Sequence, residues 1–121
     1  MNFVVIPSFQ FINDMKYFVK KKKFIKLKSD IEKFKEDLEH GDFKGVMLFE
    51  ISNDEEVYKA RMRNASINIG QSGGFRIIYY VDHLHKKVII LTIYSKSEKN
   101  SIENHEIIEL IKRYFRTVKN S

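Results

Sequence analysis

The chain has 121 residues, of which 43% are hydrophobic and 13% are aromatic. This length and composition are typical of a single globular domain with its own core, and they argue against a disordered chain. The 22 basic and 16 acidic side chains give a net charge of +6, which favours polyanions or acidic proteins as partners.

Several classes of protein are excluded by what the sequence lacks. There is no cysteine, so neither disulfides nor thiolate chemistry are available. The N-terminal apolar run at residues 3–6 is too short for a signal peptide and has no basic leader. The longest apolar run, Val88–Leu91, is far below the roughly 18 residues of a membrane span. We therefore expect one cytoplasmic domain over residues 1–121 and no membrane partner.

The first third of the chain predicts a short strand followed by two helices. Residues 2–6 are strand-like and stop at Pro7, after which Ser8 is placed to cap a helix. The lysine run at residues 20–23 follows, and it is either a solvated helix end or a phosphate-steering patch. Ser29 to Glu32 has the spacing of a capping box for the second helix, and Gly41 is a natural stop.

The hydrophobic period changes from 3.6 to 2 at Val57. Tyr58, Ala60 and Met62 alternate with cations, which predicts a strand with one apolar and one basic face. Ten of the 16 acidic residues lie in the stretch just before it, at residues 30–56. Between Glu56 and Asp82 there is no carboxylate and there are four cations, Lys59, Arg61, Arg63 and Arg76.

Two further β-branched and aromatic runs, at residues 75–81 and 88–94, predict an antiparallel hairpin. Strict alternation places Arg76, Ile78 and Tyr80 on one face. In the second strand the same alternation predicts that one face carries Val88, Ile90, Thr92, Tyr94 and Lys96. The glycines at positions 73 and 74 are expected to form a turn or bulge with positive φ.

A C-terminal helix is expected after a cap at Asn100 or Ser101. Its buried stripe should contain Ile107, Leu110, Ile111, Tyr114 and Val118. The order β-α-α-β-β-β-α predicts an α+β domain, with an antiparallel sheet on which two N-terminal helices and one C-terminal helix pack.

The basic sheet face suits the chemistry of RNA cleavage by the 2′-hydroxyl of the RNA itself. This reaction needs a proton acceptor, a proton donor and cations around the phosphate, and arginine binds phosphate oxygens in a bidentate way. Neighbouring arginines lower the pKa of a lysine, which would let Lys59 or Lys96 move protons. Tyr94 could stack on a base or donate its hydroxyl. A basic docking surface without catalysis is the alternative.

No metal or cofactor is expected. His83 and His85 have the i, i+2 spacing of a ligand pair, but a third ligand is lacking, and a solvated hairpin tip is the simpler interpretation.

Three segments resemble the RelE/HigB branch of the RelE/ParE bacterial toxin superfamily. They are residues 57–61 (VYKAR), residues 70–80 (GQSGGFRIIYY) and residues 93–99 (IYSKSEK). With the order of elements, the resemblance spans nearly the whole chain. It departs at residues 68–71, where relatives usually have a Gly-Lys-Gly-Lys-type run and this chain reads Asn-Ile-Gly-Gln.

The resemblance implies a type II toxin, a RelE-like ribosome-dependent mRNA endonuclease that uses no metal and is held inactive by a cognate antitoxin. Larger assemblies are expected to form through that antitoxin. By motif, the catalytic residues would be Arg76, Lys96, Arg61, Lys59 and Tyr94, with Arg76 stabilising transition-state charge and Lys96 or Lys59 handling protons. Lys99, Arg63 and Lys59 would bind RNA.

Two alternatives stay open at this point. One is a non-nuclease toxin of the ParE kind that acts on DNA gyrase. The other is a basic RNA-binding module without catalytic activity, which would bind RNA in a salt-sensitive way.

Overall fold

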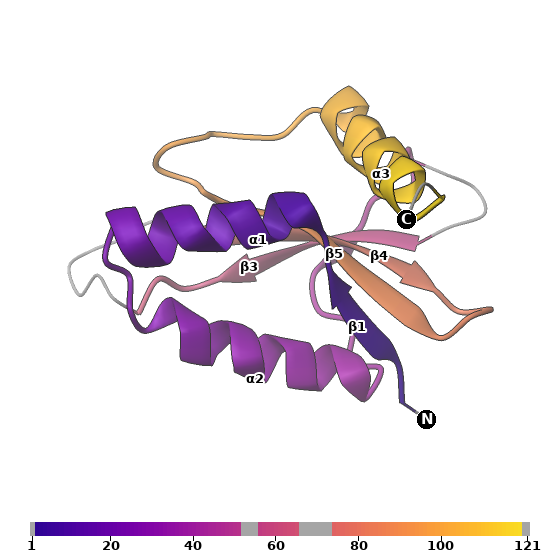
Figure 1. Ribbon diagram of the computed structural model, residues 1–121, viewed down its shortest axis with the longest axis horizontal. Helices are drawn as coiled ribbons and strands as arrows, with labels where there is room; N and C mark the ends of the chain where they lie inside the picture. The colour runs from indigo at the N-terminus through magenta and orange to yellow at the C-terminus, as the bar shows by residue number, and fades with distance from the viewer. Residues whose placement is uncertain (1, 52–55, 66–73, 120–121) are drawn as a thin grey trace.

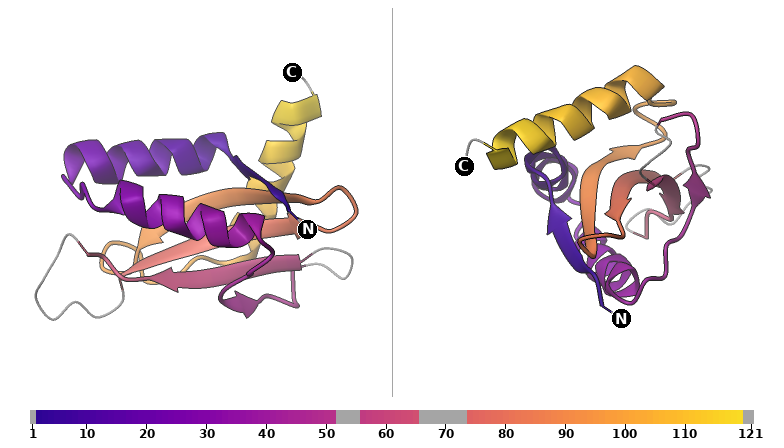
Figure 2. Two further views of the ribbon diagram at one scale, coloured as in Figure 1. Left: turned by 90° about the horizontal axis from the view of Figure 1, so that it is seen from below. Right: turned by 90° about the vertical axis from the view of Figure 1, so that its right-hand side faces the viewer.

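The computed structural model describes residues 2–51, 56–65 and 74–119. The chain folds as an α+β domain in which a five-stranded sheet carries α1 and α2 on one face and α3 on the other (Figures 1 and 2). The elements in order are β1 (Val4–Pro7), α1 (Phe9–Lys16), the π-helical turn η1 (Tyr17–Lys21), α2 (Leu27–Glu39), β2 (Val46–Met47), β3 (Glu56–Met62), β4 (Phe75–Asp82), β5 (Lys87–Ser95) and α3 (Asn104–Lys119).

The sheet has the strand order β1-β5-β4-β3-β2. The predicted α+β class is confirmed, but a purely antiparallel sheet is wrong, because β1 pairs with β5 in parallel. All other neighbours are antiparallel. The fifth strand, β2, lies in a short apolar run after residue 45, and local periodicity does not predict it. Parallel and antiparallel strands have the same alternation of side chains. The sequence alone could therefore not show that β1 runs parallel to β5.

Each face of the sheet has its own hydrophobic core. Under α1 and α2 the core is built from aromatic and aliphatic side chains that include Phe11, Phe34 and Tyr79. The opposite core is smaller and packs Ile78 and Leu91 against Ile107 of α3. Within the described residues, no helix has the length and apolar character required to cross a membrane.

A β-bulge in β5 changes which side chains share a face. Ile78 pairs with Thr92, whereas Tyr79 pairs with Ile90, so Leu91 is an extra residue. As a result Val88 and Ile90 lie in the core under α1 and α2, while Tyr94 and Leu91 lie in the core under α3. The prediction that residues 88, 90, 92 and 94 share one face is therefore wrong.

Two predicted helix ends are confirmed and two are wrong. The Ser8 hydroxyl caps α1 by accepting a hydrogen bond from the Phe11 amide, and Gly41 follows α2 with a φ of +82°. Ser29 is no N-cap, because α2 already begins at Leu27. The cap expected for α3 at residues 100–101 is also displaced, since α3 begins at Asn104.

Gly74 brings the chain into β4 through a conformation that disfavours other residues. Its φ is +56°, and a Cβ atom built there would lie 2.5 Å from the Met62 carbonyl oxygen. Its own carbonyl accepts a hydrogen bond from the Lys96 amide. The prediction of a positive φ is confirmed for Gly74, whereas the rest of the glycine-rich turn, residues 70–73, lies outside the described residues.

Gly74→Ala is expected to lower the free energy of unfolding by about 1–3 kcal/mol, because the left-handed backbone and the contact with β3 both disfavour a Cβ. Gly41→Ala is the matched control, since its φ is also positive but its Cβ would meet only Phe3 ring atoms at 3.6 Å. Urea denaturation should show the larger loss for Gly74→Ala. Equal losses would mean that the contact with Met62 carries no cost.

Candidate functional site

A row of three residues crosses the three central strands near one end of each, on the face that carries α3. Arg61 of β3 pairs with Arg76 of β4, and Arg76 pairs with Tyr94 of β5. Direct cross-strand partners project from the same face of a sheet. The predicted grouping of Arg61, Arg76 and Tyr94 is thus present in the strand register, and we call these three residues the arginine row. Lys59 lies on the same strand two residues from Arg61, opposite Ile78.

The members of the arginine row differ in exposure. Arg76 and Tyr94 are buried, with 8% and 7% of their surface exposed, whereas Arg61 is exposed. Nη1 of Arg76 donates a hydrogen bond to the Phe75 carbonyl at 3.3 Å. A guanidinium held on a central strand is fixed in position, which is the property that electrostatic stabilisation of a reacting phosphate requires.

Arg61 and Arg63 lie at the outer side of the sheet. Both line a hollow of about 350 Å³ between β3 and α2, together with Asp30 and Asp37 of that helix. Arg61 is therefore aligned with Arg76 along the backbone and also borders the hollow beside α2. Arg63 follows the end of β3 and is exposed.

Charges from the arginine row, from the loop that follows β5 and from α3 all act on the pKa of Tyr94. Burial raises the pKa of Tyr94, the charges of Arg76 and Lys99 oppose that rise, and Glu106 adds to it. The phenol is consequently protonated at neutral pH and can donate a hydrogen bond. Its electrostatic neighbours also show that the row and the start of α3 are close in space.

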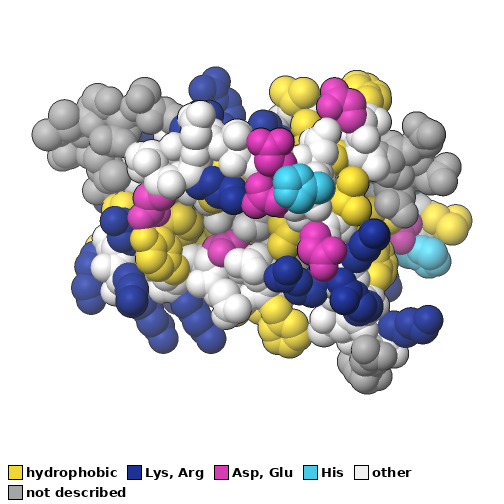
Figure 3. Space-filling view, turned by 90° about the horizontal axis from the view of Figure 1, so that it is seen from above, with side chains coloured by type: hydrophobic (Ala, Val, Ile, Leu, Met, Phe, Trp, Pro, Cys, Tyr) yellow, Lys and Arg dark blue, Asp and Glu magenta, His cyan; other side chains and the backbone are white. Residues whose placement is uncertain are grey.

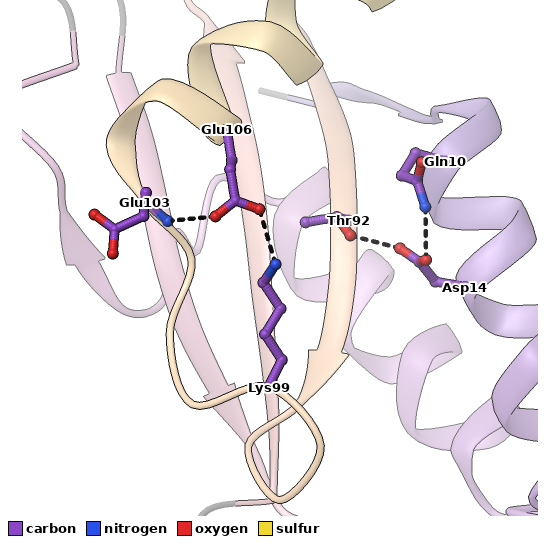
Figure 4. Close-up of polar contacts among 6 residues, drawn as sticks. All are labelled: Gln10, Asp14, Thr92, Lys99, Glu103 and Glu106. Carbon is purple, nitrogen blue, oxygen red and sulfur yellow. Dashed lines mark hydrogen bonds and ion pairs between the residues drawn. The ribbon is translucent and has the colours of Figure 1, made fainter.

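The ammonium groups of Lys96 and Lys99 have partners in the loop after β5 and in α3. Nζ of Lys96 donates to the Asn100 carbonyl, and Nζ of Lys99 lies 2.8 Å from Oε2 of Glu106 (Figure 4). Both ammonium groups are held by the loop after β5 and by the first turn of α3. Of the predicted site residues, the fold brings together Arg61, Arg76 and Tyr94, with Lys59 beside them.

A cleft of about 420 Å³ opens between α1, β5 and α3, next to Tyr94. On this face of the molecule acidic and basic side chains lie side by side rather than in separate patches (Figure 3). Of the predicted site residues, Tyr94 and Lys99 line this cleft. Its other lining side chains were not predicted from the sequence; they are Gln10, Asp14, Thr92, Ile93, Ile102, His105, Glu106, Glu109, Leu110 and Arg113.

Asp14 fastens α1 to β5 along one wall of this cleft. Its Oδ2 accepts hydrogen bonds from the Thr92 hydroxyl at 2.5 Å and the Ile93 amide at 3.1 Å, and its Oδ1 accepts one from Gln10 (Figure 4). Beyond the end of β1, the Asp14 side chain thus accepts the hydrogen bond of the Ile93 amide at the edge of β5. Burial raises the pKa of the Asp14 carboxyl, although its three hydrogen bonds act in the opposite direction.

The raised pKa of Asp14 predicts a specific dependence of stability on pH. A folded-state pKa above the unfolded value means that the contribution of Asp14 is fully present below about pH 3.8 and is lost as the pH rises through the folded-state pKa. Asp14→Asn does not titrate. The stability of the natural protein relative to Asp14→Asn should therefore fall as the pH rises.

Urea denaturation of both proteins at a series of pH values between about 3 and 7 measures this difference. Other shifted carboxyls, such as Glu106, whose pKa is lowered by the hydrogen bond from Lys99, titrate in both proteins and cancel. A difference that stays constant over this range would show that Asp14 has no raised pKa.

The histidines of the β4–β5 turn have protein partners. Nε2 of His83 lies 2.9 Å from Glu56, and Nδ1 of His85 lies 2.8 Å from Asp82. Among residues 2–51, 56–65 and 74–119, no group of three or more ligand-type side chains is arranged to hold a metal ion. In the lysine run, Lys22 pairs with Glu98 at 3.5 Å.

No family model matches the chain, and no curated protein matches it in sequence.

Proposed function

We propose that this chain is the toxin of a type II toxin-antitoxin system, a RelE/HigB-like endonuclease that cuts mRNA on the ribosome. The observation that carries the proposal is the arginine row, in which two arginines and a tyrosine lie opposite one another on three adjacent strands. Guanidinium groups bind phosphate oxygens in a bidentate way, and a tyrosine can stack on a base or donate a proton. The family resemblance of the three sequence segments supports the same function.

In the proposed reaction the ribose 2′-hydroxyl gives its proton to a general base while its oxygen attacks the adjacent phosphorus. The bond from phosphorus to the 5′-oxygen breaks, and the leaving oxygen takes up a proton from a general acid, so the products are a 2′,3′-cyclic phosphate and a 5′-hydroxyl. Arg76, with Arg61, would stabilise the charge on the pentacoordinate phosphate. No metal ion takes part in this proposed mechanism.

Lys59 is the better of the two lysines for proton transfer. Within the part of the chain that the structure describes, its ammonium group makes no hydrogen bond or ion pair, whereas that of Lys96 is bound to the Asn100 carbonyl. Lys59 also projects from the face of the arginine row. Lys96, Lys99 and Arg63 would then bind the RNA backbone outside the reacting phosphate.

The proposed partner is a cognate antitoxin with an acidic, partly disordered segment. The net charge of +6 and the basic sheet face favour such a segment, which would become ordered on contact. Co-expression with the neighbouring reading frame should yield a stable complex and relieve toxicity. A neighbouring product that neither binds nor protects would contradict this assignment.

A non-catalytic RNA-binding module is the second candidate. It is favoured by the internal contacts of Lys96 and Lys99, which withdraw two cations from the arginine row. Such a module would still bind RNA through Arg61 and Arg63, with an affinity that falls steeply with salt.

Purified protein added to translating ribosomes tests the proposed function. We expect mRNA cut within the ribosomal A site, as detected by primer extension. Salt-sensitive RNA binding without cleavage would select the docking module. Intact mRNA together with inhibition of DNA gyrase supercoiling would select a toxin of the ParE kind.

A further inference from the structure

We propose that the cleft between α1, β5 and α3 binds the nucleobase adjacent to the phosphate on the arginine row, and that it selects bases with an exocyclic amino group. This inference rests on the proposed function, since it names a subsite for the same RNA. We call this cleft the base cleft; its walls carry Gln10, Asp14, Thr92, Tyr94 and Glu106, among others.

The position of the base cleft suits the base next to the reacting phosphate. Tyr94 belongs both to the arginine row and to the wall of the cleft. The charge of Arg76 acts on the pKa of the Tyr94 hydroxyl, and so do the charges of Lys99 and Glu106, which line the cleft. A ligand whose phosphate meets Arg76 therefore has the cleft within reach of its sugar and base. The volume of about 420 Å³ falls in the range of small-molecule sites and admits a nucleoside.

The charges of the two surfaces differ in a way that matches the two halves of a nucleotide. Lys59, Arg61 and Arg76 provide three cations for the phosphate. The base cleft instead has three carboxylates (Asp14, Glu106 and Glu109) against the permanent cations Lys99 and Arg113. A phosphate is disfavoured among these carboxylates, whereas a neutral base with hydrogen-bond donors is favoured.

The acceptors of the base cleft are fixed in orientation. Oδ2 of Asp14 is occupied by Thr92 and Ile93, but Oδ1 accepts from Gln10 alone and retains a second lone pair. Glu106 is held by Lys99 and by the Glu103 amide (Figure 4). Because these groups do not need to reorient on binding, they can discriminate between ligands that donate and ligands that accept.

This acceptor pattern distinguishes uracil from the other bases. Adenine, cytosine and guanine each present an amino group that donates to a carboxylate, as cytosine N4 does to Asp or Glu. Uracil keeps one donor, its N3–H, but it has a carbonyl oxygen in the place of the cytosine amino group, and this oxygen would face a carboxylate. Leu110, Ile102 and the ring of Tyr94 supply apolar and aromatic surface for the plane of the base.

The test is an NMR titration of the full chain with AMP, CMP, GMP and UMP. We expect the amide signals of Thr92, Ile93 and Glu106 to shift, and the three amino-bearing nucleotides to bind about tenfold more tightly than UMP. In Asp14→Asn the amide group can donate to the uracil carbonyl, so the preference should shrink to about twofold or less. Glu106→Gln should reduce the preference in the same direction.

Arg61→Ala is the matched control, because loss of a phosphate contact should weaken all four nucleotides alike. The inference would be overturned if the amide signals of the cleft residues did not shift, or if UMP bound as tightly as CMP. The proposed function has a separate readout, which is mRNA cleavage. Cleavage without any shift of the cleft amides would contradict the base subsite and support the nuclease. Nucleotide binding in the cleft without mRNA cleavage would support the subsite and contradict the nuclease.

Discussion

Arg76→Ala is expected to slow mRNA cleavage by about 100-fold or more, because loss of one preorganised donor to a charged transition state commonly costs that much. Arg76 lies on the central strand β4, is buried, and has Arg61 on one side and Tyr94 on the other. It is the only arginine of the row without a solvent-exposed side chain, so water screens its charge least. Single-turnover cleavage rates on programmed ribosomes measure the effect.

Two further variants separate catalysis from folding. Arg76→Lys keeps the charge but lacks the planar fork, and it should recover only part of the rate. Arg116→Ala removes an exposed arginine that pairs with Glu109 on α3, and it should leave the rate unchanged. Circular dichroism and thermal melts establish that each variant is folded. A folded Arg76→Ala protein that cuts mRNA at the natural rate would contradict the proposed mechanism.

Tyr79→Ala is expected to cost the largest share of stability, about 3–5 kcal/mol, by analogy with the removal of other large aromatic side chains from cores. Tyr79 is fully buried, stacks on Tyr58 with ring centroids 5.1 Å apart, and meets the edge of Phe34 at 5.7 Å. Its hydroxyl donates to the Lys44 carbonyl at 2.5 Å, which anchors the segment between α2 and β2. Such a loss is a large part of the 5–15 kcal/mol that typically stabilises a domain.

Tyr79→Phe is the control that separates the ring from the hydroxyl. It retains the aromatic contacts and leaves the Lys44 carbonyl without its donor, so we expect a loss of about 1 kcal/mol. Urea denaturation, with equal slopes for all variants, measures both values. If Tyr79→Ala lost no more than Tyr79→Phe, the ring would not be a main support of the core.

Local sequence patterns predicted much of the fold. The cap at Ser8, the stop at Gly41 and the alternation of β3 are all encoded within a few neighbouring residues, and the structure contains each of them. Alternation within each strand does not decide whether Arg61 and Arg76 share a face; the register of β3 on β4 does. The cap, the stop and the alternation depend on backbone geometry that a short window of sequence determines.

The errors concern features that depend on distant parts of the chain. The bulge at Leu91 reverses the faces of Val88 and Ile90 relative to Tyr94, and no residue type in β5 marks it. The contact of Asp14 with Thr92 joins residues that are 78 positions apart. Hydrogen bonds of this kind form because α1 packs on the edge of the sheet. Sequence periodicity does not show this packing, so it could not predict the base cleft.

The chemical nature of the RNA ends is the most direct test of the proposed nuclease. Purified protein should cut ribosome-bound mRNA and leave a 2′,3′-cyclic phosphate on one fragment and a 5′-hydroxyl on the other, and a 2′-deoxy substitution at the cut nucleotide should abolish cleavage. Uncut mRNA, fragments with a 3′-hydroxyl and a 5′-phosphate, or unchanged cleavage of the deoxy-substituted mRNA would contradict it.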